Sequence, residues 1–179
     1  NTFIDIQVED IDTREVFDDL GRQEKIVDYI IQYHNQKTHN RKFAAMFAIS
    51  SIDNLIQYYD LFKKKKLAGE HDLRIAAIFT YGANPEDPDA SGMLPADYPM
   101  VAEGAEPATS TSMHREDLDR FLNDYNTMYG TSYSTRDGQQ FENYFKDISK
   151  RIKDMEKDGF NQKDRLDILL VVNMFQTGF

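Results

Sequence analysis

The stretch RLDILLVVNMFQTGF, residues 165–179, decides the fold class of this chain. Its apolar run from Leu166 to Val172 has the length of a β-strand and is interrupted only by Asp167. Such a run is typical of a strand that is covered on both faces in a parallel sheet. A short turn from Asn173 to Gly178 follows it, and open α/β sheets bind their ligands at this carboxyl edge. Because a buried strand is seldom the last element of a domain, we expect the native chain to continue past this turn.

The composition is that of a single globular domain spanning residues 1–179. Hydrophobic residues make up 40% of the chain and charged residues 29%, and a chain of about 150 residues already buries roughly 70% of its unfolded surface. No window approaches the roughly 20 apolar residues of a membrane-spanning helix, and the start NTFIDIQVED lacks the basic region of a signal peptide. The absence of cysteine excludes disulfides and thiolate metal sites and fits a reducing compartment. We therefore expect a cytoplasmic protein that has no membrane partner.

The formal net charge of −10 argues at first against a nucleic-acid partner, because phosphate binding depends on Lys and Arg. The negative charge is concentrated in one segment, however. No Lys or Arg lies between Arg74 and Arg115, whereas six carboxylates do, which leaves a net charge of −4 on the rest of the chain. A local basic surface elsewhere is therefore compatible with the composition.

Hydrophobic periodicity predicts alternating helices and strands. The expected elements are a helix at 13–37 that Gly21 could interrupt, a strand at 43–49, a helix at 52–66, a strand at 74–80 and the final strand at 166–172. This alternation is typical of an α/β protein with a parallel sheet and flanking helices. The run from Lys63 to Lys66 favours a solvated helix end over a phosphate site.

Two further segments separate the second expected strand from the last. Residues 83–112 hold all five prolines and six acidic residues without any apolar period, so we expect a mobile acidic insertion. Residues 113–158 form an expected helical insertion of two amphipathic helices, whose apolar stripes favour core packing over cofactor contacts. The stripes are Leu118, Phe121, Leu122, Tyr125 and Tyr129 on one helix and Phe141, Tyr144, Phe145, Ile148, Ile152 and Met155 on the other.

The chain contains no motif for a complete active site. The patterns GxxxxGK[ST], GxGxxG and HExxH are absent from the 179 residues. Its four histidines lack the spacing of metal ligands: they are His34, His39, His71 and His114. We therefore assign no catalytic residue and no metal ligand to this chain.

Polar turns after the three expected strands are the remaining candidates for a site. They contain Ser50 and Ser51, then Tyr81 and Gly82, and finally Asn173, Thr177 and Gly178. In a parallel sheet these turns gather at one edge, where hydroxyls and free amides suit a phosphate of a nucleotide or of a nucleic-acid backbone. The alternative is structural, because serines often cap helices and glycines often occupy turns.

Several stretches of the chain resemble a known family. RKFAAMFAISSIDNLIQYYDLFKK, LRIAAIFTYGANPED and LDILLVVNMFQTGF are similar to the second motor lobe of the restriction (R) subunit of type I restriction-modification enzymes, a superfamily 2 helicase-like DNA translocase. The first resembles motif IV of that superfamily and the last resembles the start of motif V. YNTMYGTSYST and FENYFKDISKRIK are similar to the helical insertion of the family. The resemblance implies a RecA-like helicase C-terminal lobe.

The resemblance also implies roles for the residues of the three turns. Contacts to the DNA backbone would come from Ser50, Ser51, Tyr81 and Gly82, and coupling of DNA to the nucleotide from Asn173, Thr177 and Gly178. In the family, motif V continues to an aspartate and an arginine-bearing motif VI follows, whereas this chain stops at Phe179 before both. The resemblance therefore implies one piece of a larger subunit, a piece that hydrolyses nothing by itself.

The larger subunit would be a type I site-specific deoxyribonuclease with ATP-dependent translocation. ATP and Mg²⁺ would be its cofactors, held mainly by other parts of the subunit. Its partners would be double-stranded DNA and the methyltransferase and specificity subunits, while the first motor lobe of the same subunit would face this one.

Two alternatives stay open at the level of sequence. A flavodoxin-like or receiver-like binding module shares the parallel sheet, but it needs an acidic pocket or a flavin loop on its early strands, and neither follows the strand at 43–49. A role as a protein-docking module within the restriction complex is compatible with the motor-lobe interpretation.

Overall fold

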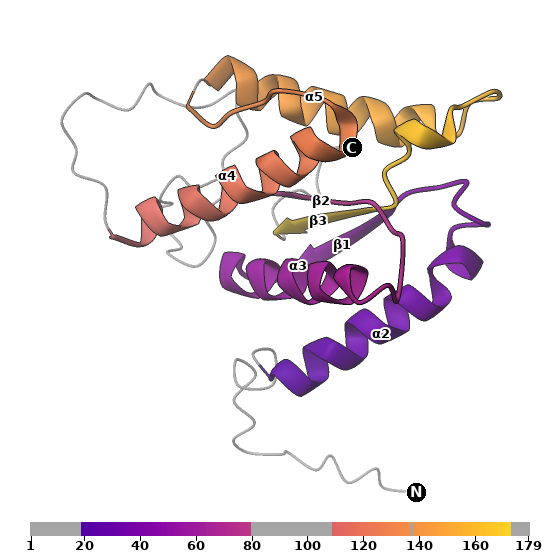
Figure 1. Ribbon diagram of the computed structural model, residues 1–179, viewed down its shortest axis with the longest axis horizontal. Helices are drawn as coiled ribbons and strands as arrows, with labels where there is room; N and C mark the ends of the chain where they lie inside the picture. The colour runs from indigo at the N-terminus through magenta and orange to yellow at the C-terminus, as the bar shows by residue number, and fades with distance from the viewer. Residues whose placement is uncertain (1–18, 80–108, 137, 173–179) are drawn as a thin grey trace, which may run out of the picture.

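The computed structural model describes residues 19–79, 109–136 and 138–172 (Figure 1). Its elements, in chain order, are α2 (Leu20–Lys37), β1 (Ala45–Ile49), α3 (Ile52–Leu67), β2 (Ile75–Ile78), α4 (Thr109–Tyr129), α5 (Gly138–Asp154), the short helix η2 (Gln162–Asp164) and β3 (Ile168–Val172). No helix in these residues is long and apolar enough to cross a membrane.

The described strands form a three-stranded parallel sheet in the order β1-β3-β2. The final strand is therefore central, and all five of its residues are buried, as its apolar composition predicted. Two expected strands are shorter than predicted: β1 begins at Ala45 rather than Phe43, and β2 is limited to Ile75–Ile78. Phe43 still belongs to the turn that follows α2 and is 36% exposed.

Helices cover both faces of the sheet. Figure 1 shows α2 and α3 on one side and α4 and α5 on the other. The strand order explains this arrangement, because the chain crosses from β1 to β2 through α3 and returns from β2 to the central β3 through α4 and α5. Crossovers between parallel strands are right-handed, so two crossovers in opposite directions lie on opposite faces. The fold is thus the α/β architecture expected from the sequence.

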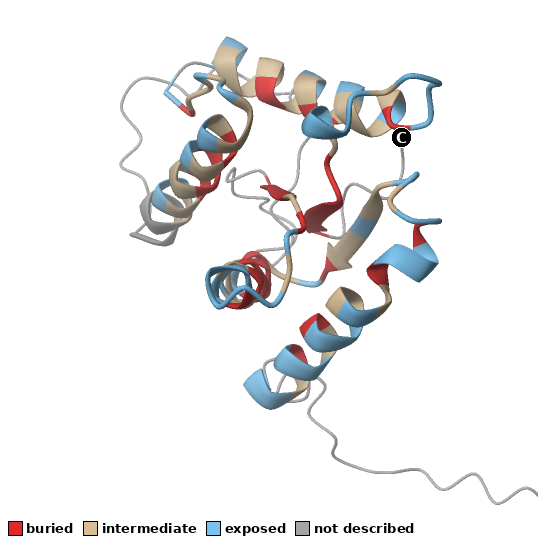
Figure 2. Ribbon diagram, turned by 45° about the vertical axis from the view of Figure 1, so that its right-hand side comes forward, coloured by how far each residue is buried: buried red, intermediate tan, exposed pale blue. Residues whose placement is uncertain are grey.

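The two helices predicted as a helical insertion form one of the covering layers. Their apolar stripes are buried, since Leu118, Phe121, Tyr125, Tyr144 and Ile148 are each at most 1% exposed. Figure 2 shows buried residues on both of these helices. The expectation that these stripes are core is confirmed. Helix α4 already begins at Thr109, inside the range 83–112 that we expected to be a mobile insertion.

Several other expectations fall wholly or partly outside the described residues. They concern the acidic segment up to residue 108, the helical start at 13–18, and the end of the second strand at Thr80. Gly21 does not interrupt α2, which begins at Leu20 and continues to Lys37 with Asp19 as its N-cap.

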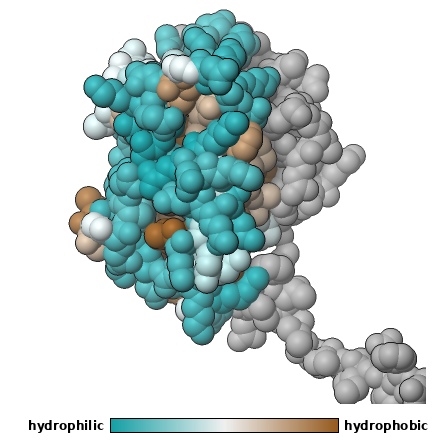
Figure 3. Space-filling view, turned by 90° about the vertical axis from the view of Figure 1, so that its right-hand side faces the viewer, coloured by the Kyte–Doolittle hydropathy of each residue, from teal (hydrophilic) through white to brown (hydrophobic). Residues whose placement is uncertain are grey.

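A charged network joins the segments that lead into the strands. The buried carboxylate of Asp167 accepts the backbone N–H of Arg74 at 2.8 Å and Nε of Arg165 at 3.1 Å, which explains the single charge in the apolar run. Asp72 accepts two hydrogen bonds from Arg41, at 2.9 and 2.6 Å, and one from Arg165 at 3.2 Å. The face of the molecule on this side is mostly hydrophilic (Figure 3).

A left-handed turn leads from α2 toward β1. Residues 39–41 have φ angles between 51° and 64°, a conformation that costs L-residues about 1–2 kcal/mol each. Thr38 stabilises the turn: its carbonyl accepts the N–H of Lys42 at 2.9 Å, and its hydroxyl accepts the N–H of Arg41 at 3.2 Å. The turn places Arg41 within reach of Asp72.

Candidate functional site

The carboxyl ends of the three strands lie level at one edge of the sheet. Ile49 of β1 is paired in register with Val172 of β3, and Ile78 of β2 is paired with Val171. The three strand ends therefore lie at the same edge of the sheet, as expected for parallel strands, and of the turns that follow them only the one after β1 belongs to the described residues. Of the predicted site residues, Ser50 and Ser51 are described, whereas Tyr81, Gly82, Asn173, Thr177 and Gly178 lie outside the described residues.

Ser50 and Ser51 have different surroundings. Ser51 is the N-cap of α3, with extended backbone, and its Oγ accepts the N–H of Asn54 at 3.2 Å. Ser50 is exposed, and its Oγ lies 3.5 Å from Nδ2 of Asn54. The structural alternative therefore applies to Ser51, which stabilises the start of α3, while Ser50 is the serine that faces outward.

A cluster of hydrogen-bonded amide side chains from α2 and α3 lies next to the two serines. Gln23 of α2 is 0% exposed, and its Nε2 donates to Oδ1 of Asn54 at 2.9 Å and to Oε1 of Gln57 at 2.8 Å. Asn54 thus contacts α2 and both serines. Sequence reasoning missed Gln23, although it precedes Val27 by one helical turn on the buried stripe of α2.

A hollow of about 320 Å³ opens beside Ser50 at this edge. Its lining comes from α2, β1 and α3: Arg22, Ile26, Phe47, Ala48, Ile49, Ser50, Asn54 and Tyr58. Burial raises the pKa of the Tyr58 hydroxyl, and the positive charge of Arg22 opposes this shift. The phenol therefore stays neutral near pH 7, and Arg22 is the cation of the hollow.

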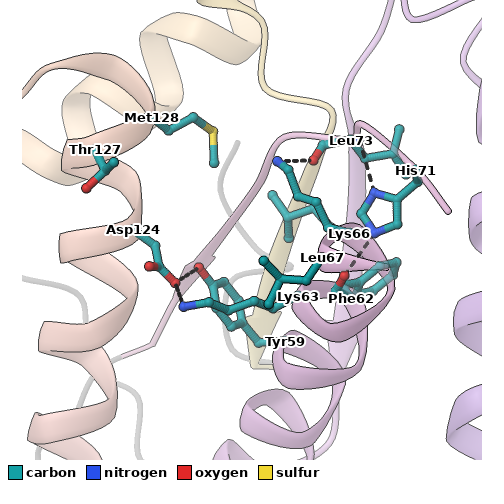
Figure 4. Close-up of a pocket in the computed structure, with 11 residues that line it drawn as sticks. Tyr59, Phe62, Lys63, Lys66, Leu67, His71, Leu73, Asp124, Thr127 and Met128 are labelled. Atoms are coloured by element: carbon teal, nitrogen blue, oxygen red, sulfur yellow. Dashed lines mark hydrogen bonds and ion pairs between the residues drawn. The ribbon is translucent and has the colours of Figure 1, made fainter. Parts of the chain in front are cut away.

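A second and larger cavity, of about 410 Å³, lies between α3, α4 and the start of β2 (Figure 4). Asp124 accepts hydrogen bonds from Lys63 at 2.6 Å and from the hydroxyl of Tyr59 at 2.9 Å. Nζ of Lys66 donates to the carbonyl of Leu73 at 2.8 Å, and burial lowers its pKa. These polar groups thus already have hydrogen-bond partners, and much of the remaining wall is apolar: Phe62, Leu67, Leu73, Ile75 and Met128.

The lysine run is not a uniformly solvated helix end. The side chain of Lys65 is only 11% exposed, and its Nζ pairs with Asp28 of α2 at 2.7 Å and with Glu70 at 3.4 Å. The expectation was wrong for Lys65 because its partner on α2 is remote in sequence and invisible to local patterning. Lys64 remains exposed.

Titratable groups elsewhere give no sign of a metal centre within the described ranges. Burial lowers the pKa of His34, and burial is also the main cause of the lowered pKa of His71, whose Nε2 lies 2.9 Å from the carbonyl of Phe62. No group of three or more His, Asp or Glu in residues 19–79, 109–136 and 138–172 could hold a metal ion.

Comparison with known proteins identifies similar sequences. Residues 41–179 match the family of type I restriction enzyme subunit R domain 3. The chain is 38% identical over 172 residues to the SauCOLORF180P endonuclease subunit of Staphylococcus aureus strain COL, an alignment that covers 96% of this chain and 16% of that protein. It is 36% identical over 179 residues to the SsaAORF53P endonuclease subunit of Staphylococcus saprophyticus, covering 100% of this chain and 17% of that protein. The chain therefore spans about a sixth of the length of these type I restriction enzyme relatives.

Proposed function

Since this chain belongs to the family of type I restriction enzyme R subunits, we propose that it is the second motor lobe of an ATP-dependent DNA translocase. In this role the carboxyl edge of its sheet contacts the backbone of the DNA, and the lobe helps to close an ATP site shared with the first motor lobe. The full subunit, like the endonuclease subunits to which the chain is similar, cleaves DNA.

The observation that carries the proposal is the position of Ser50. It is exposed, it follows the first of three parallel strands whose carboxyl ends lie level, and it borders a hollow that contains a cation. Most contacts between proteins and DNA are made to phosphates and sugars, and hydroxyls and guanidinium groups are common donors in them. This edge offers both kinds of donor.

The cofactors of the full subunit are ATP and Mg²⁺. The described residues alone do not fit either group, since they hold no metal-ligand cluster and the sequence has no phosphate loop. We therefore assign the binding of phosphates and metal to the first lobe. The contribution of this lobe is to complete the site on closing, as in other phosphoryl-transfer enzymes with moving domains.

The proposed partners follow from the same assignment. They are double-stranded DNA, the first motor lobe of the subunit, and the methyltransferase and specificity subunits of the complex. A flavodoxin-like or receiver-like role is less supported, because the cation Arg22 borders the hollow after β1 where such modules need acidic or flavin-binding residues.

The test is a Ser50→Ala variant of the complete R subunit, assayed for translocation on linear duplex at saturating ATP. We expect slower translocation with unchanged nucleotide binding, since one neutral hydrogen bond contributes roughly 0.5–1.5 kcal/mol. Ser51→Asn, which preserves a capping side chain, serves as the neighbouring control. Translocation at the wild-type rate by a well-folded Ser50→Ala subunit would contradict the assignment of this edge to DNA.

A further inference from the structure

We propose that the cavity between α3 and α4 receives an apolar side chain from an acidic segment of the same R subunit, a segment that lies outside these 179 residues. The cavity is then a docking site that joins this lobe to another part of its own polypeptide. It lies beside the start of β2, at the amino end of the sheet. The inference therefore goes beyond the proposed function and does not depend on a contact between the carboxyl edge and DNA.

The cavity is apolar and reaches the surface. Its volume of about 410 Å³ is within the range of about 300–1,000 Å³ that is usual for binding pockets. Phe62 and Leu73 in its lining are 1% and 2% exposed, whereas Leu67 in the same lining is 81% exposed. Figure 4 shows Met128 of α4 directed toward α3. The apolar wall thus continues from the core onto the outside of α3, as in a surface that binds another polypeptide.

The polar groups of the cavity hold its two walls together. Asp124 of α4 accepts hydrogen bonds from Lys63 and Tyr59 of α3, so these contacts fix the distance between the two helices. Both ring nitrogens of His71 lie at hydrogen-bond distance from main-chain groups, at 3.1 and 2.9 Å. An apolar side chain can therefore enter without displacing these bonds, and a cavity that is formed before binding lowers the entropy that binding costs.

Lysines beside the cavity favour an acidic occupant. Their neighbours in the lysine run already bind carboxylates. Lys64 and Lys66 form no ion pair within the part of the chain that the structure describes: Lys64 is exposed, and Lys66 donates to a main-chain carbonyl. Lys64 precedes Leu67 by three residues, so the two side chains are neighbours on the surface of α3. A segment that packs beside Leu67 thus meets two positive charges in a chain whose net charge is −10.

The size of the site favours an occupant that is covalently attached. Stable complexes between separate proteins bury about 1,200–2,000 Å², more than one cavity with a single exposed leucine in its lining supplies. A tethered segment needs less contact, because its effective concentration reaches the millimolar range. This chain covers 16% of a related endonuclease subunit, so most of such a polypeptide lies outside these residues. We therefore assign the occupant to the rest of the subunit.

The test introduces the photocrosslinker p-benzoylphenylalanine at position 67 of the complete R subunit, and at position 20 as the control. Leu20 of α2 is also an exposed leucine, with 61% exposure. Mass spectrometry identifies the crosslinked peptides. We expect position 67 to crosslink, within one polypeptide, to a segment outside these 179 residues that contains Asp or Glu. Position 20 should not crosslink to that segment.

Other crosslinks from position 67 overturn the proposal. A product of twice the subunit mass assigns the cavity to a second copy. A product that contains a methyltransferase or specificity subunit, in the assembled complex, assigns it to a partner chain. A crosslink to a peptide from within the 179 residues, or no crosslink at all, also contradicts docking by the rest of the subunit.

Two further variants of the crosslinking subunit test the charge and the cavity. Lys64→Glu should lower the crosslinked fraction about two- to fivefold, the effect of an exposed ion pair, whereas Lys25→Glu on the exposed side of α2 should not change it. Thr127→Trp, which adds a large side chain to the wall of the cavity, should remove the crosslink. Melting curves show whether each variant folds. If folded Lys64→Glu or folded Thr127→Trp leaves the crosslinked fraction unchanged, the proposal fails.

Discussion

The hydroxyl of Tyr144 donates a 2.8 Å hydrogen bond to the main-chain carbonyl of Ala77. This contact matters because β2 is an outer strand of the three described, and an outer strand presents unpaired main-chain groups. The carbonyl of Arg74 faces β3, where it accepts a main-chain N–H at 3.1 Å. Because the carbonyls of successive residues in a strand point in opposite directions, those of Leu73 and Ala77 point away from β3. Lys66 donates to that of Leu73 at 2.8 Å. Side chains from α5 and α3 thus donate hydrogen bonds to two main-chain carbonyls along this edge.

We predict that Tyr144→Phe destabilises the protein by about 1–3 kcal/mol, because it leaves the carbonyl of Ala77 buried without a donor. Both residues are 0% exposed, and the ring contacts of Tyr144 with Tyr125 and Phe141 do not require the hydroxyl. Urea unfolding followed by circular dichroism measures the change. The matched control is Tyr29→Phe, at a position 53% exposed, which should change stability by less than about 0.5 kcal/mol. Equal effects at the two positions would show that the edge contact contributes nothing.

Substitutions of the two serines after β1 should differ in their effect on the stability of the protein. Ser51→Ala removes the N-cap of α3 and should cost about 0.5–2 kcal/mol. Ser50→Ala should stay within about 0.5 kcal/mol of wild type, because Ser50 is exposed and lies at the 3.5 Å limit from Asn54. Thermal melting of both variants is sufficient. A larger loss of stability for Ser50→Ala than for Ser51→Ala would contradict the assignment of Ser51, rather than Ser50, as the cap of α3.

Local pattern was enough to predict the sheet. Leu166 to Val172 predicted a buried strand because so continuous an apolar run of this length is typical of a strand covered on both faces, and β3 is the central strand of the three described. The stripes of α4 and α5 were recognisable for the same reason, since helical spacing marks a buried face. The common edge of the strand ends followed once the strands were taken to be parallel.

Contacts between remote residues could not be predicted. Asp167 interrupts the apolar run, and its carboxylate accepts the backbone N–H of Arg74, which lies 93 positions away in the sequence. Gln23 and Asn54 are 31 positions apart, so no local pattern in either helix indicates their hydrogen bond. Arg22 was missed for a related reason, because its place beside Ser50 depends on how α2 packs on α3.

Stability at acid pH should depend on Asp72. Its hydrogen bonds from Arg41 are the main cause that holds the pKa of this carboxyl well below its ordinary value of 3.8. A lowered pKa stabilises the fold above the ordinary value, and this contribution is lost as the pH falls through the lowered pKa. The side chain is 70% exposed, so we expect only about 0.2–1 kcal/mol. Melting temperatures of wild type and Asp72→Asn should therefore differ at pH 7, and the difference should shrink as the pH falls below 3.8 and through the lowered pKa.

The control for this measurement is Asp158→Asn, which removes an exposed carboxylate from the turn after α5. It should leave the melting curve close to that of the wild type throughout the acid range. A difference between wild type and Asp72→Asn that persists unchanged into acid would show that the ion pair with Arg41 is not its cause.

The 179-residue chain by itself should show no ATPase activity above background, with or without duplex DNA. Phosphoryl transfer depends on groups that cradle the phosphates and on a metal ion that neutralises developing charge. The sequence has no phosphate loop, and the described residues have no metal-ligand cluster. The measurement is phosphate release over a range of ATP and Mg²⁺ concentrations, with the complete R subunit assayed in parallel as the positive control. A rate that saturates with ATP and disappears in a Thr177→Ala variant would mean that this lobe holds an active site of its own.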